Sequence, residues 1–395
     1  MQNNLTKKEI DNLYNWAKEY DIKKLKTKDK NKLLDIKELT LDELFRAEKK
    51  ISYIPNEIFK LVNLKELYIN SINLKALPKD IGNLINLEEL TIGGFRGCKL
   101  KKLPKEIGKL TNLKKLEISC KKLNELPKEL FNLTNLKEFE IRSENLEKLP
   151  KEIGKLTNLK KLEISYEKSN ELPKELFNLT NLKEFEIRSE NLEKLPKEIA
   201  NFVNLKSLII SCDKLVKLPK EICNFSKLEN IEIACENLKE LPHEIGNLKK
   251  LKYFTLWESN LKKFPKEFGN LINLEYFKIY SSYSLKEFPK EIANFTKLIH
   301  LTIECYKMKE LPREIGNLIN LKSLHIKSAN LKELPKEIKN LVNLERIDII
   351  WDGYAKELPN EILNFEKLKF IEIKKRDSFI NRLEDNIKLK KPKRK

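Results

Sequence analysis

Apolar residues recur in one fixed order along most of this chain. The order is L-x-x-L-x-I, in which the last two apolar residues alternate with polar ones, and a proline follows nine residues after the isoleucine. One copy contains Leu136, Phe139, Ile141 and Pro150. Alternation with a period of two predicts a short strand with one buried face. Fourteen prolines spaced by 23, 24 or 26 residues set the period at about 23.

Fifteen strand starts follow this period. They are Ile36, Leu64, Leu87, Leu113, Leu136, Leu159, Leu182, Leu205, Leu228, Leu251, Leu274, Leu298, Leu321, Leu344 and Leu368. Between strands the chain reads L-P-K-E-I-G-N-L, which predicts a short helix with the proline at its first position and an acid close behind, near the positive end of the helix dipole. One such unit cannot bury its apolar face alone, so stability must come from stacked copies.

The motif L-P-K-E-I-G-N-L-x-N-L-x-x-L-x-I resembles the leucine-rich-repeat family, in particular the 23-residue type of bacterial and Ras-group intracellular members. The resemblance covers about residues 36–373, and WAKEYDI at Trp16–Ile22 is similar to the N-terminal cap of bacterial members. It implies an α/β fold, a right-handed solenoid or horseshoe with a parallel sheet on the concave face and short helices or turns on the convex face. We expect a helical cap at 1–35, about fifteen repeats at 36–373, and a C-terminal cap and basic tail at 374–395.

The chain departs from the family pattern at the ninth position of each repeat. The family has an asparagine there, whose amide bonds backbone groups of neighbouring turns, whereas this chain has residues such as Glu144, Glu190 and Glu236. An asparagine often follows one place later. Either this displaced asparagine forms the same row of hydrogen bonds between repeats, called the asparagine ladder, or the ladder is missing.

Four insertions break the period, at Asp42–Lys50, Gly93–Lys99, Ser281–Ser284 and Asp352–Ala355. All four are expected after a strand, where they lengthen loops at one edge of the solenoid. The glycine-rich segment Gly93–Gly97 lacks the lysine and the serine or threonine of a phosphate-binding loop. We therefore interpret it as a tolerated lengthening of the loop, without a function in binding.

The formal net charge of +19 raises nucleic acid or anionic membrane as partners. More than half of this charge lies at the two ends, in residues 1–35 and 374–395. The repeats interleave lysine with glutamate, which weakens that interpretation. Binding of nucleic acid or membrane through the basic tail Lys388–Lys395 is kept as the alternative function.

The six cysteines show no paired spacing, and the chain has neither a signal-peptide core nor an apolar stretch of membrane-spanning length. These features favour free thiols and the cytoplasm. Cys120, Cys212, Cys235 and Cys305 share one repeat position. They are expected to be buried thiols used in packing, and the alternative is a redox or metal pair formed by Cys212 and Cys235.

The residues at positions three, five and seven of each repeat should point away from the core. In the repeats from Leu113 to Leu182 they alternate acids with bases, which predicts a self-neutralised surface. Further along they become aromatic or apolar at Tyr253, Trp257, Tyr276, Tyr280, His300, His325, Ile350 and Trp351. Tyrosine and tryptophan are enriched in protein-binding hot spots, so we predict that these residues form a partner-binding patch. Ile350 is not assigned to the patch.

Catalytic constellations are scarce. The histidines His243, His300 and His325 fall in different repeats, and the common catalytic and metal-binding motifs are absent from the sequence. We therefore expect no catalytic residues, no metal and no cofactor. The predicted function is a monomeric, non-enzymatic scaffold that binds a protein partner on its concave face.

Overall fold

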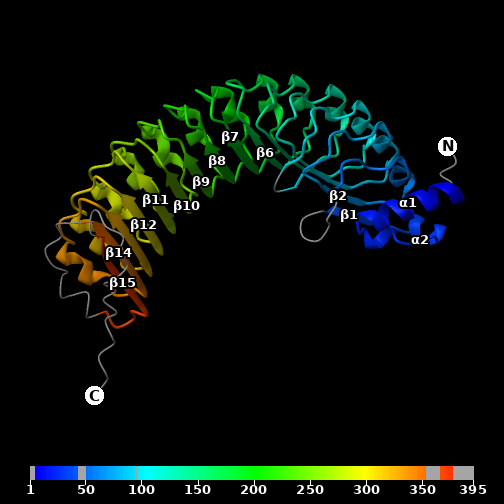
Figure 1. The fold of residues 1–395 in the computed structure, drawn as a ribbon. Helices are drawn as coiled ribbons and strands as arrows, with labels where there is room; N and C mark the ends of the chain where they lie inside the picture. The colour runs from blue at the N-terminus through cyan, green and yellow to red at the C-terminus, as the bar shows by residue number, and fades with distance from the viewer. Residues whose placement is uncertain (1–4, 43–49, 95–96, 353–364, 377–395) are drawn as a thin grey trace, which may run out of the picture. The chain divides into compact units, whose positions relative to one another are not determined.

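A computed structural model describes residues 5–42, 50–94, 97–352 and 365–376. The chain divides into two compact units, Met1–Asn191 and Leu192–Lys395, and each is described by itself. In both, parallel strands alternate with short 3-10 helices, so that the strands lie along one side and the helices along the other (Figure 1). Among the described residues, no helix is long and apolar enough to cross a membrane.

The first unit begins with helices α1 (Lys7–Glu19), η1 (Lys23–Leu25) and α2 (Lys30–Leu34). Thr6 caps α1, since its side chain accepts the backbone N–H of Glu9 while the Glu9 carboxylate accepts that of Thr6. Helix α1 buries the face that carries Leu13 and Trp16. This capping box explains why the helix begins at Lys7.

The strands of the first unit pair in chain order, each parallel to the next. They are β1 (Glu38–Asp42), β2 (Glu66–Asn70), β3 (Glu89–Ile92), β4 (Lys115–Ser119), β5 (Glu138–Ser143), β6 (Lys161–Tyr166) and β7 (Glu184–Arg188). The 3-10 helices between them are η2 (Asn56–Lys60), η3 (Lys79–Asn83), η4 (Lys105–Lys109), η5 (Lys128–Asn132), η6 (Lys151–Lys155) and η7 (Lys174–Asn178).

The second unit continues the same alternation, again with strands paired in chain order. Its strands are β8 (Ser207–Ser211), β9 (Asn230–Ala234), β10 (Tyr253–Trp257), β11 (Tyr276–Ser282), β12 (His300–Cys305), β13 (Ser323–Ser328), β14 (Arg346–Asp352) and β15 (Phe370–Arg376). Its 3-10 helices are η8 (Lys197–Asn201), η9 (Lys220–Asn224), η10 (His243–Asn247), η11 (Lys266–Asn270), η12 (Lys290–Asn294), η13 (Arg313–Asn317) and η14 (Lys336–Asn340). The expected leucine-rich-repeat solenoid architecture is thereby confirmed in each unit.

The core lies between the strands and the 3-10 helices. The two alternating apolar residues of each strand point into it, as Phe139 and Ile141 do with at most 1% of their surface exposed. In the second unit the core is unusually rich in phenylalanine. Phe277 contacts five other rings at centroid distances of 5.2–6.0 Å, and these rings belong to Phe254, Phe264, Phe268, Phe288 and Phe295.

The prolines stand one place earlier than we predicted from the sequence. From Pro55 to Pro335, each repeat proline precedes its five-residue 3-10 helix as the N-cap, as Pro55 does with extended backbone at φ −68° and ψ 143°. Its carbonyl accepts the N–H of the residue three places on, as in Ile58 N–H to Pro55 O at 3.2 Å. A turn this short needs the proline carbonyl as its first acceptor, while the missing proline N–H costs nothing there.

The displaced asparagines do take the ladder role, which resolves the alternative that the sequence left open. Asn145, Asn237 and Asn330 each donate from the side-chain amide to the backbone carbonyl 24 residues earlier, over 2.7–3.1 Å. Asn191 donates to the Glu167 carbonyl in the same way. The ladder is thus shifted by one residue rather than lost.

A second asparagine ladder runs through the N-L-x-x-L segment before each strand. Asn112, Asn135 and Asn158 donate to backbone carbonyls of the preceding repeat at 2.8–2.9 Å, and Asn320 does the same at 2.7 Å. These bonds satisfy carbonyls that the strands leave open between repeats. This ladder was not predicted from the repeat pattern.

The shared cysteine position is buried, as predicted, at Cys120, Cys212, Cys235 and Cys305. The prediction that all six thiols are free is wrong, because Cys120 forms a disulfide with Cys98. Cys98 lies in the Gly93–Lys99 insertion and has no counterpart in other repeats, so repeat spacing could not reveal the pair. The bond ties this insertion to the next repeat.

The Ser281 insertion is a bulge at the end of β11. Ile279 pairs with Ile303 in register, but the next pair is Ser282 with Cys305, so one residue is extra on β11. Ser281 absorbs it with a left-handed backbone at φ 54°. Most of the insertions after Asp42 and Asp352 lie outside the described residues.

Candidate functional site

The outward residues of the strands form a continuous exposed surface in each unit, which we call the strand face. These residues occupy positions three, five and seven of each repeat. Because neighbouring strands pair in register, they form three rows that cross the strands at a spacing of about 4.8 Å. Glu117, Glu140 and Glu163, for example, are consecutive members of the middle row.

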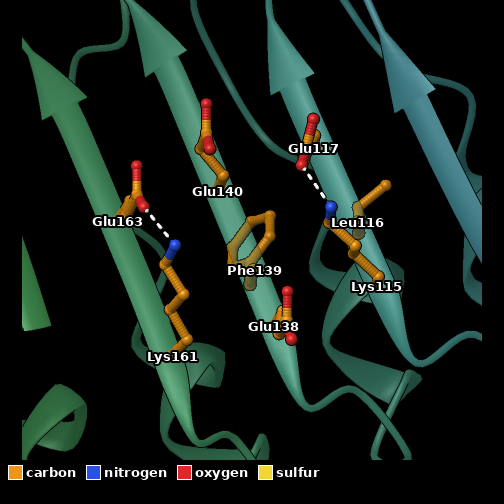
Figure 2. A pocket seen from close by; sticks show the side chains of 8 residues that line it. All are labelled: Lys115, Leu116, Glu117, Glu138, Phe139, Glu140, Lys161 and Glu163. Atoms are coloured by element: carbon orange, nitrogen blue, oxygen red, sulfur yellow. Dashed lines mark ion pairs between the residues drawn. The ribbon is translucent and has the colours of Figure 1, made fainter. Parts of the chain in front are cut away.

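In the first unit, charges on the strand face are paired with one another. Lys115 contacts Glu117 at 2.8 Å, and Lys161 contacts Glu163 at 2.8 Å (Figure 2). Arg188 pairs with the Glu186 carboxylate on the same strand, β7. This confirms the self-neutralised surface that the sequence indicated.

Arg142 joins the middle row by contacting Glu140 at 2.8 Å and Glu163 at 3.3 Å. Burial raises the pKa of Glu140 to about 6; Arg142 opposes this shift, and the neighbouring glutamates reinforce it. Burial also acts to raise the pKa of Glu163, but the hydrogen bond from Lys161 and the charge of Arg142 outweigh it and leave that pKa lowered. The pKa values of the neighbouring carboxylates Glu140 and Glu163 are therefore shifted in opposite directions.

A small hollow opens among these side chains (Figure 2). Its lining consists of Lys115, Leu116, Glu117, Glu138, Phe139, Glu140, Lys161 and Glu163. Both lysines in the lining already contact a glutamate, and the apolar members belong to the core. Nothing in this hollow calls for a ligand, and we assign it no function.

In the second unit the strand face carries two stacks of aromatic rings. Tyr253, Tyr276 and His300 lie in the position-three row, with ring centroids 4.7 Å apart at both steps and interplanar angles of 15° and 12°. Trp257 and Tyr280 stack in the position-seven row at 4.0 Å and 18°. Five of the residues predicted for the patch are thereby brought together.

The two rings that begin these stacks are the most exposed. Tyr253 is 41% exposed and Trp257 is 37% exposed, whereas Tyr276, Tyr280 and His300 are half-buried. The position-three and position-seven rows are about 13 Å apart along a strand. The middle row between them holds polar side chains on β10, β11 and β12.

Burial affects the ionisable rings in these stacks. It raises the pKa of Tyr280, with a hydrogen bond from Thr302 acting against the shift. It lowers the pKa of His300, and the nearby charges of Lys278 and Lys322 lower it further. Both rings are therefore neutral at pH 7 and can offer a stacked aromatic surface.

The remaining predicted residues lie apart from the stacks. His325 is in the middle row, where its Nδ1 lies 2.9 Å from Asp348 and its Nε2 lies 3.4 Å from Glu304. It belongs to a polar cluster rather than to an aromatic one. Trp351 is part of β14, but its side chain lies outside the described residues, as does the tail Lys388–Lys395.

Sequence reasoning missed two partners of the patch. The Glu232 carboxylate accepts a hydrogen bond from Trp257 Nε1 at 2.9 Å, which fixes the indole orientation. Tyr283 stacks on Tyr306 at 5.2 Å beyond the ends of β11 and β12. Glu232 is an ordinary middle-row residue, and only its position one strand before an outward tryptophan signals the contact.

The thiols offer no reactive centre. Burial raises the pKa of Cys235 to about 12, and its Sγ lies 3.9 Å from the Ile210 carbonyl. A redox or metal pair with Cys212 needs the thiolate, which this environment disfavours. Within the described ranges, no cluster of three or more His, Cys, Asp or Glu side chains has the arrangement to hold a metal ion.

Comparison with known proteins agrees with the architecture. A family model for a leucine-rich-repeat region matches residues 94–198 and 190–312. A leucine-rich-repeat protein of Leptospira interrogans is 30% identical, with a TM-score of 0.70, over 89% of this chain and 94% of that chain. A search of curated proteins finds no match.

Two other solved structures share the fold at lower identity. An internalin of Listeria monocytogenes is 18% identical with a TM-score of 0.62, over 95% of this chain and 98% of that chain. The chain is 19% identical to a structure of the Toll–Spätzle complex of Drosophila, with a TM-score of 0.55, over 76% of this chain and 44% of that chain. The repeat period, the parallel strands, the asparagine ladders and these matches together show that the chain belongs to the leucine-rich-repeat family.

Proposed function

We propose that the chain is a non-enzymatic scaffold that binds a protein partner on the strand face of the second unit. The observation that carries the proposal is the pair of aromatic stacks headed by Tyr253 and Trp257. Aromatic side chains left exposed on a soluble protein are costly, and they dominate binding energy in protein interfaces. The Toll–Spätzle neighbour is itself a complex, which supports a partner of the same general kind.

The stacks are arranged before any partner arrives. Tyr276 and Tyr280 are each held by a neighbouring ring, and Trp257 is also held by its hydrogen bond to Glu232. Side chains that are already ordered lose little conformational entropy on binding, so more of the contact energy appears as affinity.

The test compares the intact chain with the double variant Trp257→Ala/Tyr280→Ala in affinity capture from cells of the native organism. We expect the double variant to lose the captured protein while keeping its circular dichroism spectrum. Tyr53→Ala is the matched control, because Tyr53 is 53% exposed but belongs to the first unit and to neither stack. Equal recovery of the partner by all three proteins would sink the proposal.

The same proposal includes a monomeric chain in the cytoplasm, with no cofactor. The Cys98–Cys120 disulfide bears directly on the compartment, because disulfides persist mainly in oxidising surroundings. Thiols trapped with a membrane-permeant alkylating agent before lysis decide the matter. Cys98 labelled in intact cells fits the cytoplasm, and protected Cys98 contradicts it.

A further inference from the structure

Glu232 is chemically isolated on the strand face. Among the outward residues of β8, β9 and β10 it is the one that carries a charge, and none of the described cations forms an ion pair with it. Its Oε1 accepts the Trp257 indole N–H, and the other oxygen has no such bond.

Trp257 directs the N–H edge of its indole ring towards Glu232, because the ring N–H donates in the plane of the ring. One ring face stacks on Tyr280, which lies on the far side from β9. On the near side the register partner is Ala234, whose methyl group is too small to cover the ring. This geometry accounts for the 37% exposure of Trp257 and leaves an open ring face beside a carboxylate.

The hydrogen bond between Glu232 and Trp257 makes this face more attractive to a cation. An indole N–H that donates to a carboxylate is polarised, which increases the electron density of the ring. Tryptophan already offers the strongest cation–π surface of the aromatic side chains. A cation on the ring can reach the free carboxylate oxygen of Glu232 at the same time.

From these contacts we infer that the strand face binds an arginine side chain of the partner, stacked on Trp257 and paired with Glu232. The inference rests on the proposed function, which says only that a protein binds here. Arginine fits better than lysine because its planar guanidinium can stack on the indole while its N–H groups, arranged as a fork, donate to the carboxylate.

Lys278 allows a test of whether the partner's anchoring side chain is positively or negatively charged. It lies in the same middle row two strands from Glu232, about 10 Å away. It has no ion pair with the described acids, so it is the alternative charged anchor, one that would select an acidic partner. Lys278→Gln should therefore leave arginine binding unchanged or slightly tighter, because it removes a like charge.

The first experiment presents a library of randomised nonapeptides to the immobilised full chain. We expect arginine to be enriched on the wild type, and this enrichment to weaken on Glu232→Gln while any preference for apolar residues persists. Enrichment of apolar residues without arginine, or of aspartate and glutamate, overturns the inference but leaves the proposed function standing. No enrichment of any residue overturns both.

The second experiment measures one selected peptide in solution against its citrulline analogue, which keeps the shape of arginine without the charge. On the wild type the analogue should bind about tenfold more weakly, the size expected for a desolvated cation–π contact with a charge pair. On Glu232→Gln the difference should shrink to the part that the Trp257 ring face alone supplies. Thermal unfolding of this variant checks that the fold is retained. A tenfold difference that persists in Glu232→Gln would show that the arginine binds elsewhere.

Discussion

Replacing Phe277 by alanine tests the packing that supports the aromatic strand face. Phe277 is fully buried, and its backbone neighbours on β11 are Tyr276 and Lys278. Removing a buried phenylalanine costs about 3–5 kcal/mol. Its edge contacts with Phe254 add about 0.5–1.5 kcal/mol for a favourable pair, although these terms overlap. We therefore expect a loss of about 4 kcal/mol.

Hydrogen exchange read by mass spectrometry is the appropriate assay, because a repeat array need not unfold in one step. Amides of β10–β12 should exchange about 1000-fold faster in Phe277→Ala, which follows from about 4 kcal/mol. Phe277→Leu should give a smaller effect of about 1–2 kcal/mol, and the amides of β3–β5 should not change in either variant. A loss below about 1 kcal/mol in the alanine variant would refute the close packing described for this core.

Three further predictions concern the first unit and the ladders. Alkylation of the unfolded, unreduced chain should label four cysteines, and six labelled cysteines would contradict the disulfide. The double variant Cys98→Ser/Cys120→Ser should lower the free energy of unfolding by about 3 kcal/mol. Since the folded state raises the pKa of Glu140 from 4.5 to about 6, the folded chain binds this proton more tightly. The contribution of Glu140 to stability should therefore fall as the pH rises through that window. Glu140→Gln should remove about 1 kcal/mol of this pH dependence between pH 4.5 and 6, as measured by urea unfolding. Asn237→Ala should lower the urea midpoint by an amount equal to about 1 kcal/mol, and an unchanged midpoint would argue against the ladder bond.

Most of the fold could be predicted because each repeat states the same pattern again. The strand positions follow from apolar alternation, and every predicted strand start precedes an observed strand. The 3-10 helices of the repeats and the position of Pro55 before η2 could not be derived, because a five-residue turn carries too little pattern to separate the two helix types.

The candidate site divides in the same way. Register alone placed Tyr253 beside Tyr276 and Trp257 beside Tyr280, since outward residues of neighbouring strands must meet. The contact between Trp257 and Glu232 depends on a side-chain rotamer, which sequence spacing does not specify. The Cys98 disulfide was hidden for another reason: it joins an insertion to a repeat, and insertions have no period from which to argue.

The bulge at Ser281 has a consequence for how such a surface can change over time. An added residue is absorbed within one strand end by a shift of one residue, and pairing resumes with Ser282 and Cys305. A mutation or small insertion in one repeat therefore leaves the outward residues of its neighbours where they were. Each repeat can vary as a separate module, so new specificity can be assembled one strand at a time without redesign of the scaffold.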